Sequence, residues 1–259
     1  MITLKKLATL PKGTKVRKCL RLLESFQNKL RLNQSIDKDY LEGLIAILLG
    51  EVDDPLIRSK LLEINLEEEI LWPLSDALFL LQQSLNIERG DWDFEEREEG
   101  KGERQTYPFT LVLDRLRSPF NVGSIFRTAE SFGVEQIYLV EPSAAPSHPR
   151  AMRSGRGCQE EIPHQSVEEG ELIELLRGRP LFALESGGEA ITTFEFPQEG
   201  VAIIGSEELG VSPAMLAAAE RSLGRVTIPL YGRKGSLNVS VAFGILMSTW
   251  FNQVNQREY

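Results

Sequence analysis

The stretch Ile228-Pro229-Leu230-Tyr231-Gly232-Arg233-Lys234-Gly235-Ser236-Leu237-Asn238-Val239-Ser240 lies between a short β-branched run and a long apolar segment. Pro229 ends the run, because proline has no N–H to donate to a sheet. Two glycines keep the following loop pliable. Ser236, Asn238 and Ser240 then alternate with apolar residues as a helix begins. Such side chains can cap a helix, but three polar side chains are more than a single helix cap requires. The stretch therefore predicts a strand, a polar loop and a helix, with the loop as a candidate site.

Two loops earlier in the chain have the same setting. Pro119 occupies the first position of a predicted helix, and Asn121 and Gly123 fall in its first turn, where free backbone N–H groups suit an anion. The second loop, Gly205-Ser206-Glu207-Glu208-Leu209-Gly210, has glycines that allow close approach of the backbone, although it is not the GxGxxG fingerprint of dinucleotide sites. Taken alone, each loop is also compatible with a capped helix or an ordinary turn.

Short apolar runs alternate with helical segments from Tyr107 onward, which predicts an α/β domain with a mainly parallel sheet. Ligands of such sheets bind beyond the carboxyl ends of the strands, so the site is expected in the loops described above. The predicted strands are 109–113, 137–140, 181–184, 201–204 and 226–228. The predicted helices run from Pro119 to Phe132, over 168–177, from Ser212-Pro213 onward and over 237–251, and residues 141–160 are predicted to form a long loop.

The first part of the chain reads differently, because it lacks β-branched runs and has helical periodicity. Helices are predicted over 16–32, 39–49, 55–64 and 75–85, with Pro73 breaking the pattern before the last of them. The polar, charged segment that follows reads as a linker. The predicted organisation is a helical region over 1–90, a charged linker over 91–106 and an α/β domain over 107–259.

The net charge of −9 argues against a nucleic-acid partner, but the charge is unevenly distributed. Residues 1–38 hold ten Lys and Arg against two acids, a net +8, whereas 39–105 carry a net −12. The basic segment either contacts RNA phosphates or pairs internally with the acidic helices. RNA contact is favoured, because the cations are spaced too densely to pair fully with a few helices.

Composition excludes several classes of site. Two cysteines, Cys19 and Cys158, and two histidines leave no metal or disulfide framework. The aliphatic run 44–49 is far shorter than the roughly 20 residues that span a bilayer. No apolar signal-peptide core precedes Lys5. A cytoplasmic protein without metal or membrane contact is therefore expected.

In this order and spacing, the three loops resemble the SpoU-type (TrmH-like) branch of the SPOUT RNA methyltransferases, over about residues 107–255. The matching blocks are Asn121, Gly123 and Arg127–Ala129; Gly205, Glu207 and Gly210; and Ile228–Pro229 with Ser236–Ser240. Ser118 and Ser206 stand where the family often has Asp and Asn. The resemblance implies a trefoil-knotted α/β domain, a homodimer, S-adenosylmethionine as methyl donor and 2′-O-methylation of a ribose in tRNA or rRNA. A final helix with apolar residues on more than one face also favours a dimer.

The resemblance also implies roles for individual residues. The catalytic group is Arg127, Glu207, Ser236, Asn238 and Asn121. Arg127 is expected to clamp the phosphate beside the target ribose rather than act as a base, because a guanidinium has a pKa above about 12. Glu207 would orient and charge-balance Arg127. The donor is expected to be framed by the main chain at Leu184, Gly205, Ile228, Leu230 and Leu237, with no room for a side chain at Gly205. The residues expected to contact RNA phosphates are Arg115, Arg117 and Arg153.

Two other function classes fit the sequence. One is a catalytically inactive adaptor of the same fold that binds S-adenosylmethionine or RNA; retention of the whole catalytic group argues against it. The other is an acidic α/β enzyme with a small-molecule substrate, which the net charge favours only weakly.

Overall fold

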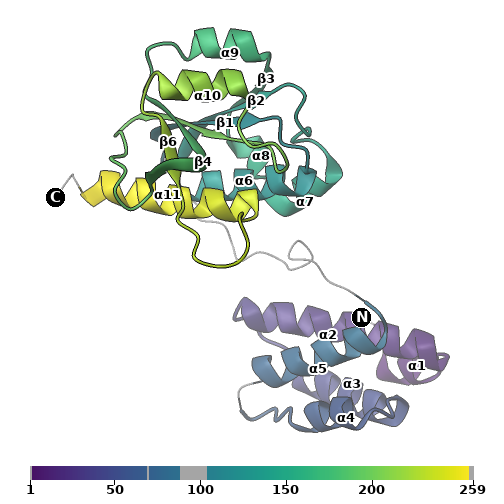
Figure 1. Cartoon of the computed structure of the whole chain (residues 1–259). Coiled ribbons are helices and arrows are strands. Elements are labelled where there is room, and N and C mark those ends of the chain that lie inside the picture. Colours follow the sequence, from purple (N-terminus) through teal and green to yellow (C-terminus); the bar gives the residue numbers. More distant parts are fainter. Residues whose placement is uncertain (1, 69, 88–103, 257–259) are drawn as a thin grey trace. The chain divides into compact units, whose positions relative to one another are not determined.

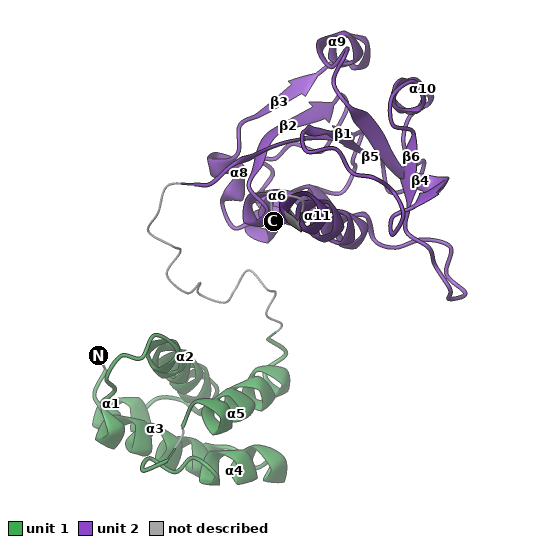
Figure 2. Ribbon diagram, turned by 90° about the vertical axis from the view of Figure 1, so that its left-hand side faces the viewer, with its two compact units in different colours: residues 1–100 green, residues 101–259 purple. Residues whose placement is uncertain are grey.

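The computed structural model describes residues 2–68, 70–87 and 104–256 and divides the chain into two compact units, Met1–Gly100 and Lys101–Tyr259 (Figures 1 and 2). Most of the predicted linker, residues 91–103, lies outside the described residues. None of the described helices has both the length and the apolar character needed to cross a membrane.

The first unit is helical. Its elements are α1 (Leu4–Ala8), α2 (Lys12–Arg31), α3 (Lys38–Glu51), α4 (Pro55–Leu62) and α5 (Leu71–Ser84). The carboxylate of Asp54 accepts hydrogen bonds from the N–H groups of Leu56 and Ile57 and so caps α4, with Pro55 at its first position. Pro73 does not break α5, as the sequence had suggested; it lies in the first turn, where a missing N–H costs no intrahelical bond.

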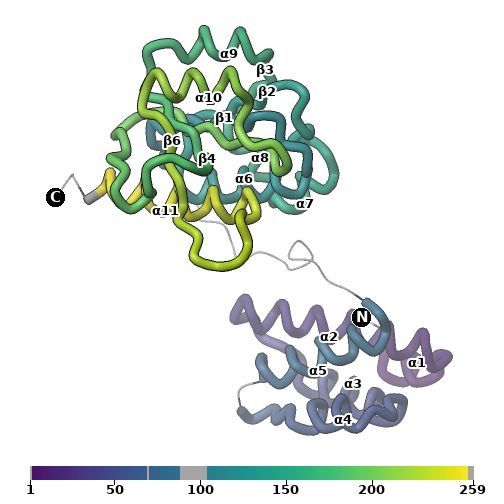
Figure 3. The backbone as a smooth tube through the Cα atoms, in the orientation of Figure 1, coloured from purple at the N-terminus to yellow at the C-terminus, as the bar shows by residue number. Residues whose placement is uncertain are grey.

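The second unit is built on a six-stranded sheet in the order β3-β2-β1-β5-β4-β6, in which every pair of neighbouring strands is parallel. Figure 3 traces the path of the chain through this unit. The strands are β1 (Tyr107–Asp114), β2 (Val134–Val140), β3 (His164–Val167), β4 (Leu181–Ala190), β5 (Gly200–Ile204) and β6 (Arg225–Thr227). The predicted α/β class and parallel sheet are confirmed. The trefoil knot stays a prediction.

Helices cover both faces of this sheet (Figure 2). The helices are α6 (Pro119–Ser131), α7 (Pro149–Gly155), α8 (Cys158–Glu161), α9 (Glu169–Leu175), α10 (Pro213–Glu220) and α11 (Val239–Gln256). Because strand side chains alternate, Leu111 and Leu113 of β1 enter the core with α6 and α11, whereas Val112 enters the core with α9 and α10. Two of these helices, α7 and α8, lie in the segment 141–160 that was predicted to be a loop.

The strand register aligns the carboxyl ends of β1, β5 and β6 with Leu184 of β4, after which the pairing of β4 with β6 shifts in register. Leu113 of β1 and Leu184 of β4 both pair with Ile204 of β5, and Leu184 also pairs with Val226 of β6. The residues that follow this row begin the loops of interest. Segments far apart in sequence therefore meet at one edge of the sheet.

Candidate active site

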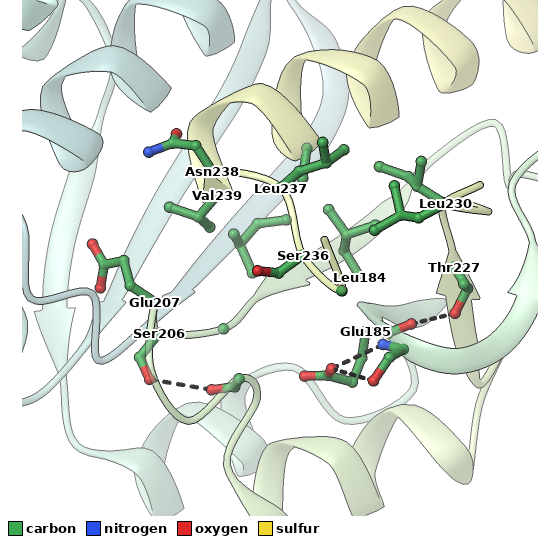
Figure 4. A pocket seen from close by; sticks show the side chains of 17 residues that line it. Leu184, Glu185, Ser206, Glu207, Thr227, Leu230, Ser236, Leu237, Asn238 and Val239 are labelled. Carbon is green, nitrogen blue, oxygen red and sulfur yellow. Dashed lines mark hydrogen bonds between the residues drawn. The ribbon is translucent and has the colours of Figure 1, made fainter. Parts of the chain in front are cut away.

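A cavity of about 520 Å³ opens at this edge (Figure 4), within the size range of ligand pockets. Leu230 lies at one end of the cavity and Glu207 at the other (Figure 4). The lining includes all five residues expected to frame the donor, Leu184, Gly205, Ile228, Leu230 and Leu237. It also includes three of the five expected catalytic residues, Glu207, Ser236 and Asn238.

A chain of side-chain hydrogen bonds joins the three loops. The Nδ2 of Asn121 donates to Oε1 of Glu207 at 2.8 Å, and the Nδ2 of Asn238 donates to Oδ1 of Asn121 at 3.1 Å. The Oδ1 of Asn238 accepts from the N–H and the hydroxyl of Ser240 at 2.9 and 2.7 Å, which fixes the start of α11. Asn121 is buried, so an amide that donates to one loop and accepts from another makes a well-ordered link.

The carboxylate of Glu207 also binds the backbone of the first loop. It accepts hydrogen bonds from the N–H groups of Arg117 and Ser118, both at 3.0 Å. Burial alone would raise the pKa of Glu207, but the hydrogen bonds from Arg117, Asn121 and Ser118 outweigh it and hold this pKa below its ordinary value. Glu207 is thus kept ionised as a clamp between two loops.

Arg127 lies apart from the cavity lining. Its side chain is exposed on α6, six residues after Asn121. The expected pairing with Glu207 is not among the ion pairs of the described residues, and the carboxylate bonds backbone and amide N–H groups instead. The pairing of Arg127 with Glu207 was expected from their opposite charges, but charge does not determine which hydrogen-bond donors the folded loop places beside Glu207.

The motif glycines are required for close packing of the chain. A Cβ at Gly205 would lie 2.2–2.6 Å from the backbone of Gly210 and Val211. It would therefore clash with the returning segment of its own loop, whereas the sequence had suggested that it would fill the donor space. A Cβ at Gly123 would lie 2.1 Å from the carbonyl oxygen of Ala151, so this glycine lets α6 approach α7.

Glu185 is a cavity residue that the sequence analysis missed. Its Oε2 accepts from the N–H of Val211 at 3.0 Å, and its Oε1 accepts from the N–H of Ser186 at 2.8 Å. It follows the predicted strand 181–184 directly, so the rule that sites lie at strand carboxyl ends was the signal that would have found it.

The expected phosphate contacts have different surroundings. Arg115 donates to Asp114 and Glu169, both at 2.8 Å, and a phosphate would have to compete with these two carboxylates. Ser212 occupies the N-cap position of α10, but its hydroxyl donates to Glu169 at 2.5 Å and makes no side-chain capping hydrogen bond. The side chain of Arg117 is exposed, and so is that of Arg153 on α7.

No group of His, Cys, Asp and Glu that could hold a metal ion occurs within 2–68, 70–87 and 104–256. The groups available for chemistry at the cavity are therefore its aliphatic and main-chain walls, the carboxylates of Glu185 and Glu207, and the side chains of Ser236 and Asn238. Comparison with family models matches residues 108–248 to the SpoU rRNA Methylase family.

The chain belongs to the SpoU family.

Individual relatives and solved structures agree with this membership. An uncharacterised tRNA/rRNA methyltransferase of Synechocystis is 33% identical over 53% of this chain and 50% of its own length. The 23S rRNA (guanosine(2553)-2'-O)-methyltransferase RlmP of Bacillus subtilis is 32% identical over 53% of this chain and 55% of its own length. The crystal structure of the AdoMet-bound rRNA methyltransferase of Sinorhizobium meliloti, 26% identical, aligns over 58% of each chain with a TM-score of 0.53.

The match confirms the family inferred from the three loops. The chain spans about half the length of the Synechocystis relative, and the family match begins at residue 108, so the helical unit lies outside it.

Proposed function

We propose that this chain is an S-adenosylmethionine-dependent RNA methyltransferase that modifies a ribose 2′-hydroxyl in tRNA or rRNA. The observation that carries the proposal is the hydrogen-bonded chain Glu207–Asn121–Asn238 beside the cavity at the sheet edge. It unites the three SpoU sequence blocks at one place. The names of the B. subtilis and S. meliloti proteins support the reaction class.

The cavity lining fits the donor. Aliphatic side chains such as Leu184 and Leu230 offer flat apolar contact for an adenine, and the main chain at Gly205 and Ile228 offers polar groups to its edges. Glu185 and Glu207 supply negative charge that favours a cationic ligand. When bound, S-adenosylmethionine would supply an activated methyl group, which passes to the 2′-oxygen as its bond to sulfur breaks and a neutral thioether leaves.

The residues of the chain then position the acceptor. Arg127 donates a bidentate hydrogen bond to the phosphate beside the target ribose. Ser236 and Asn238 hydrogen-bond the ribose hydroxyl at the cavity, and Glu207 keeps the first and second loops together. The 2′-proton leaves to the phosphate, water or a neighbouring hydroxyl, because Arg127 does not lose its proton. Arg117 and Arg153 contact flanking phosphates.

The active form is a homodimer. The apolar side chains of Val241 and Ile245, one turn apart on α11, are 52% and 38% exposed. Phe120 on α6 is 45% exposed, and α6 packs beside α11. Exposed apolar groups gathered on adjacent helices are typical of an interface between subunits. RNA substrates of this class also fit a cytoplasmic protein.

Transfer of labelled methyl groups from S-adenosylmethionine to total RNA tests the proposal, with the products mapped as 2′-O-methylated nucleotides. We expect label in ribose at a small number of sites. Donor binding without any transfer to RNA would instead identify an inactive adaptor. Transfer to a small molecule and not to RNA would favour the acidic small-molecule enzyme.

A further inference from the structure

The helical unit carries a basic surface that its own acids neutralise only in part. Lys12 pairs with Asp53 at 3.1 Å, and Lys38 pairs with Glu67 at 3.5 Å. Lys15 pairs with Glu51. Three cations of the basic segment 1–38 are therefore neutralised by acids of the same unit. The other cations of this segment need a separate explanation.

Arg17, Lys18 and Arg21 form a compact basic group on α2. All three side chains are exposed, on the side of the helix away from its buried residues. Arg17 and Arg21 are one turn apart and lie on the same face. None of the three takes part in an ion pair of the described residues, although acidic groups are abundant in the same unit.

Two large aromatic side chains are exposed on α5. Trp72 is 73% exposed and Phe79 is 58% exposed. They are seven residues apart, so they lie on one face of the helix with about 10 Å between their positions along its axis. Solvent exposure of large aromatic side chains on one helix face is costly in water and is typical of a binding surface.

The aromatic and basic groups flank the same pair of helices, since α2 and α5 pack together. Gln27 of α2 donates to Ser75 of α5 at 2.8 Å, and Gln82 of α5 donates to Glu24 of α2 at 2.8 Å. On α5, Trp72 lies three positions before Ser75, and Phe79 lies three positions before Gln82. On α2, Arg21 and Arg17 lie three and seven positions before Glu24. Because residues three, four or seven apart are neighbours on a helix surface, both groups border the α2–α5 contact.

Among the described residues, two acids of α2 and α5 that border this surface have a cationic or an amide partner. Asp76, between the two aromatic residues, lies 3.6 Å from the ammonium group of Lys60. Glu24 accepts the hydrogen bond from Gln82. The surface therefore presents a net positive edge beside two exposed rings.

We propose that this basic–aromatic face, formed by Arg17, Lys18, Arg21, Trp72 and Phe79, binds a single-stranded segment of the RNA substrate. The proposal rests on the proposed function for the nature of the substrate. The cations contact phosphates, and the rings stack on unpaired bases, which an A-form duplex does not expose. The helical unit thereby selects RNA molecules that offer a loop or a single strand.

The test compares binding of the full chain to a single-stranded RNA 20-mer and to a duplex of the same length, over a range of salt concentrations. Wild type is expected to prefer the single strand. The triple variant R17A/K18A/R21A should bind more weakly, with the log–log salt slope reduced by about 2, at about 0.7 for each lost contact. The double variant W72A/F79A should lose at least about fivefold in affinity for each ring, with the slope unchanged.

Two control variants test whether the effects depend on this face rather than on the loss of charge or apolar area anywhere on the chain. The triple variant K12A/K38A/R177A removes the same charge from exposed cations that are paired with acids, and L56A/L62A removes exposed apolar groups from α4. Both should bind RNA as wild type does. Ultraviolet cross-linking of wild type to the same RNA should mark peptides of α2 and α5, a readout that does not depend on any variant folding.

Wild-type affinity and slope in R17A/K18A/R21A, or wild-type affinity in W72A/F79A, would overturn the proposal. So would W72A/F79A abolishing self-association while RNA binding is retained, because the face would then contact a second protein chain. Methyl transfer by wild type is measured separately. If RNA binds through this face but no methyl group is transferred, the proposed function is wrong and this inference stands. If methyl transfer occurs but the variants bind RNA as wild type does, this inference is wrong and the proposed function stands.

Discussion

The side-chain amide of Asn238 donates to the amide oxygen of Asn121 at 3.1 Å, across 117 residues of sequence. Asn121 in turn donates to Glu207. An amide that donates on one side and accepts on the other has its orientation set by its partners. Asn121 therefore joins the loop after β6 to the loop after β5 through the first turn of α6, and a change at any of the three residues should affect the other two.

Replacing Asn121 by alanine should destabilise the α/β unit by about 1–3 kcal/mol, because it removes two hydrogen bonds at a buried position and leaves partners unsatisfied. Denaturant unfolding measures this loss. Asn255→Ala is the matched control, since Asn255 bonds only its own helix, at the carbonyl of Phe251, and should change the free energy of unfolding by less than about 0.5 kcal/mol. Equal effects of the two changes would argue against the link.

The lowered pKa of Glu207 makes a pH-dependent contribution to stability. Because this pKa is lower in the folded than in the unfolded state, where it is about 4.3, the stabilisation is present above about pH 5 and is lost as pH falls below about 4. Glu207→Gln should therefore be less stable than wild type at pH 7, and the difference should shrink on acidification. Unfolding at several pH values tests this, with Glu208→Gln as the control. A difference independent of pH would exclude an ionised clamp.

Much of the fold was predictable because the strands are buried. Runs such as 111–113 and 201–204 are apolar throughout, as is typical of strands covered on both faces. The strand that the sequence pattern did not predict is β3, whose His164, Gln165 and Ser166 are exposed at the edge of the sheet and form no apolar run. The short helices α7 and α8 were missed because Pro, Ser and Gly are frequent over 141–160; in the structure both helices pack against α6, and His148 caps α7.

The site was predictable in location but not in its contacts. Strand ends and sequence blocks identified every residue expected to frame the donor, and all of them line the cavity. The pairing of Glu207 with backbone N–H groups depends on the path of the first loop, and residue types cannot give that path. In the same way, a glycine motif predicts close approach without saying what approaches, which is why the neighbours of Gly205 were misjudged.

Gly205→Ala should destabilise the loop directly. Its Cβ would lie within 2.6 Å of backbone atoms of Gly210 and Val211, which cannot move aside as a flexible side chain does. We expect a loss of about 1–3 kcal/mol together with weaker donor binding, measured by denaturant unfolding and calorimetry. Gly235→Ala, where a Cβ meets nothing within 4 Å, should keep wild-type stability. Full stability in Gly205→Ala combined with lost donor binding would restore the view that this position faces the donor.

Charges placed on the exposed face of α11 should prevent dimer formation. Val241→Glu with Ile245→Glu puts two carboxylates into the proposed interface, where burying unpaired charge is costly. Sedimentation at micromolar concentration should give a dimer mass for wild type and a monomer mass for the variant. Leu175→Glu, at a 55% exposed position on α9 on the other face of the sheet, should stay dimeric. A monomeric wild type would contradict the proposed assembly.

Arg127→Ala should slow transfer strongly while leaving donor binding intact. Arg127 is exposed on α6 and does not line the cavity, so the dissociation constant of S-adenosylmethionine, measured by calorimetry in EDTA, should equal that of wild type. Removal of one charge-stabilising donor commonly costs about 100- to 1000-fold in rate, and we expect a loss of that order in single-turnover transfer to RNA. Arg127→Lys should recover part of the rate, because an ammonium keeps the charge but not the bidentate geometry. If Arg127 were instead the base, the lysine variant would shift the pH–rate profile to lower pH, since a lysine loses its proton more readily than an arginine. An unchanged profile with a reduced rate therefore supports the phosphate clamp, and a shifted profile would assign the proton to Arg127.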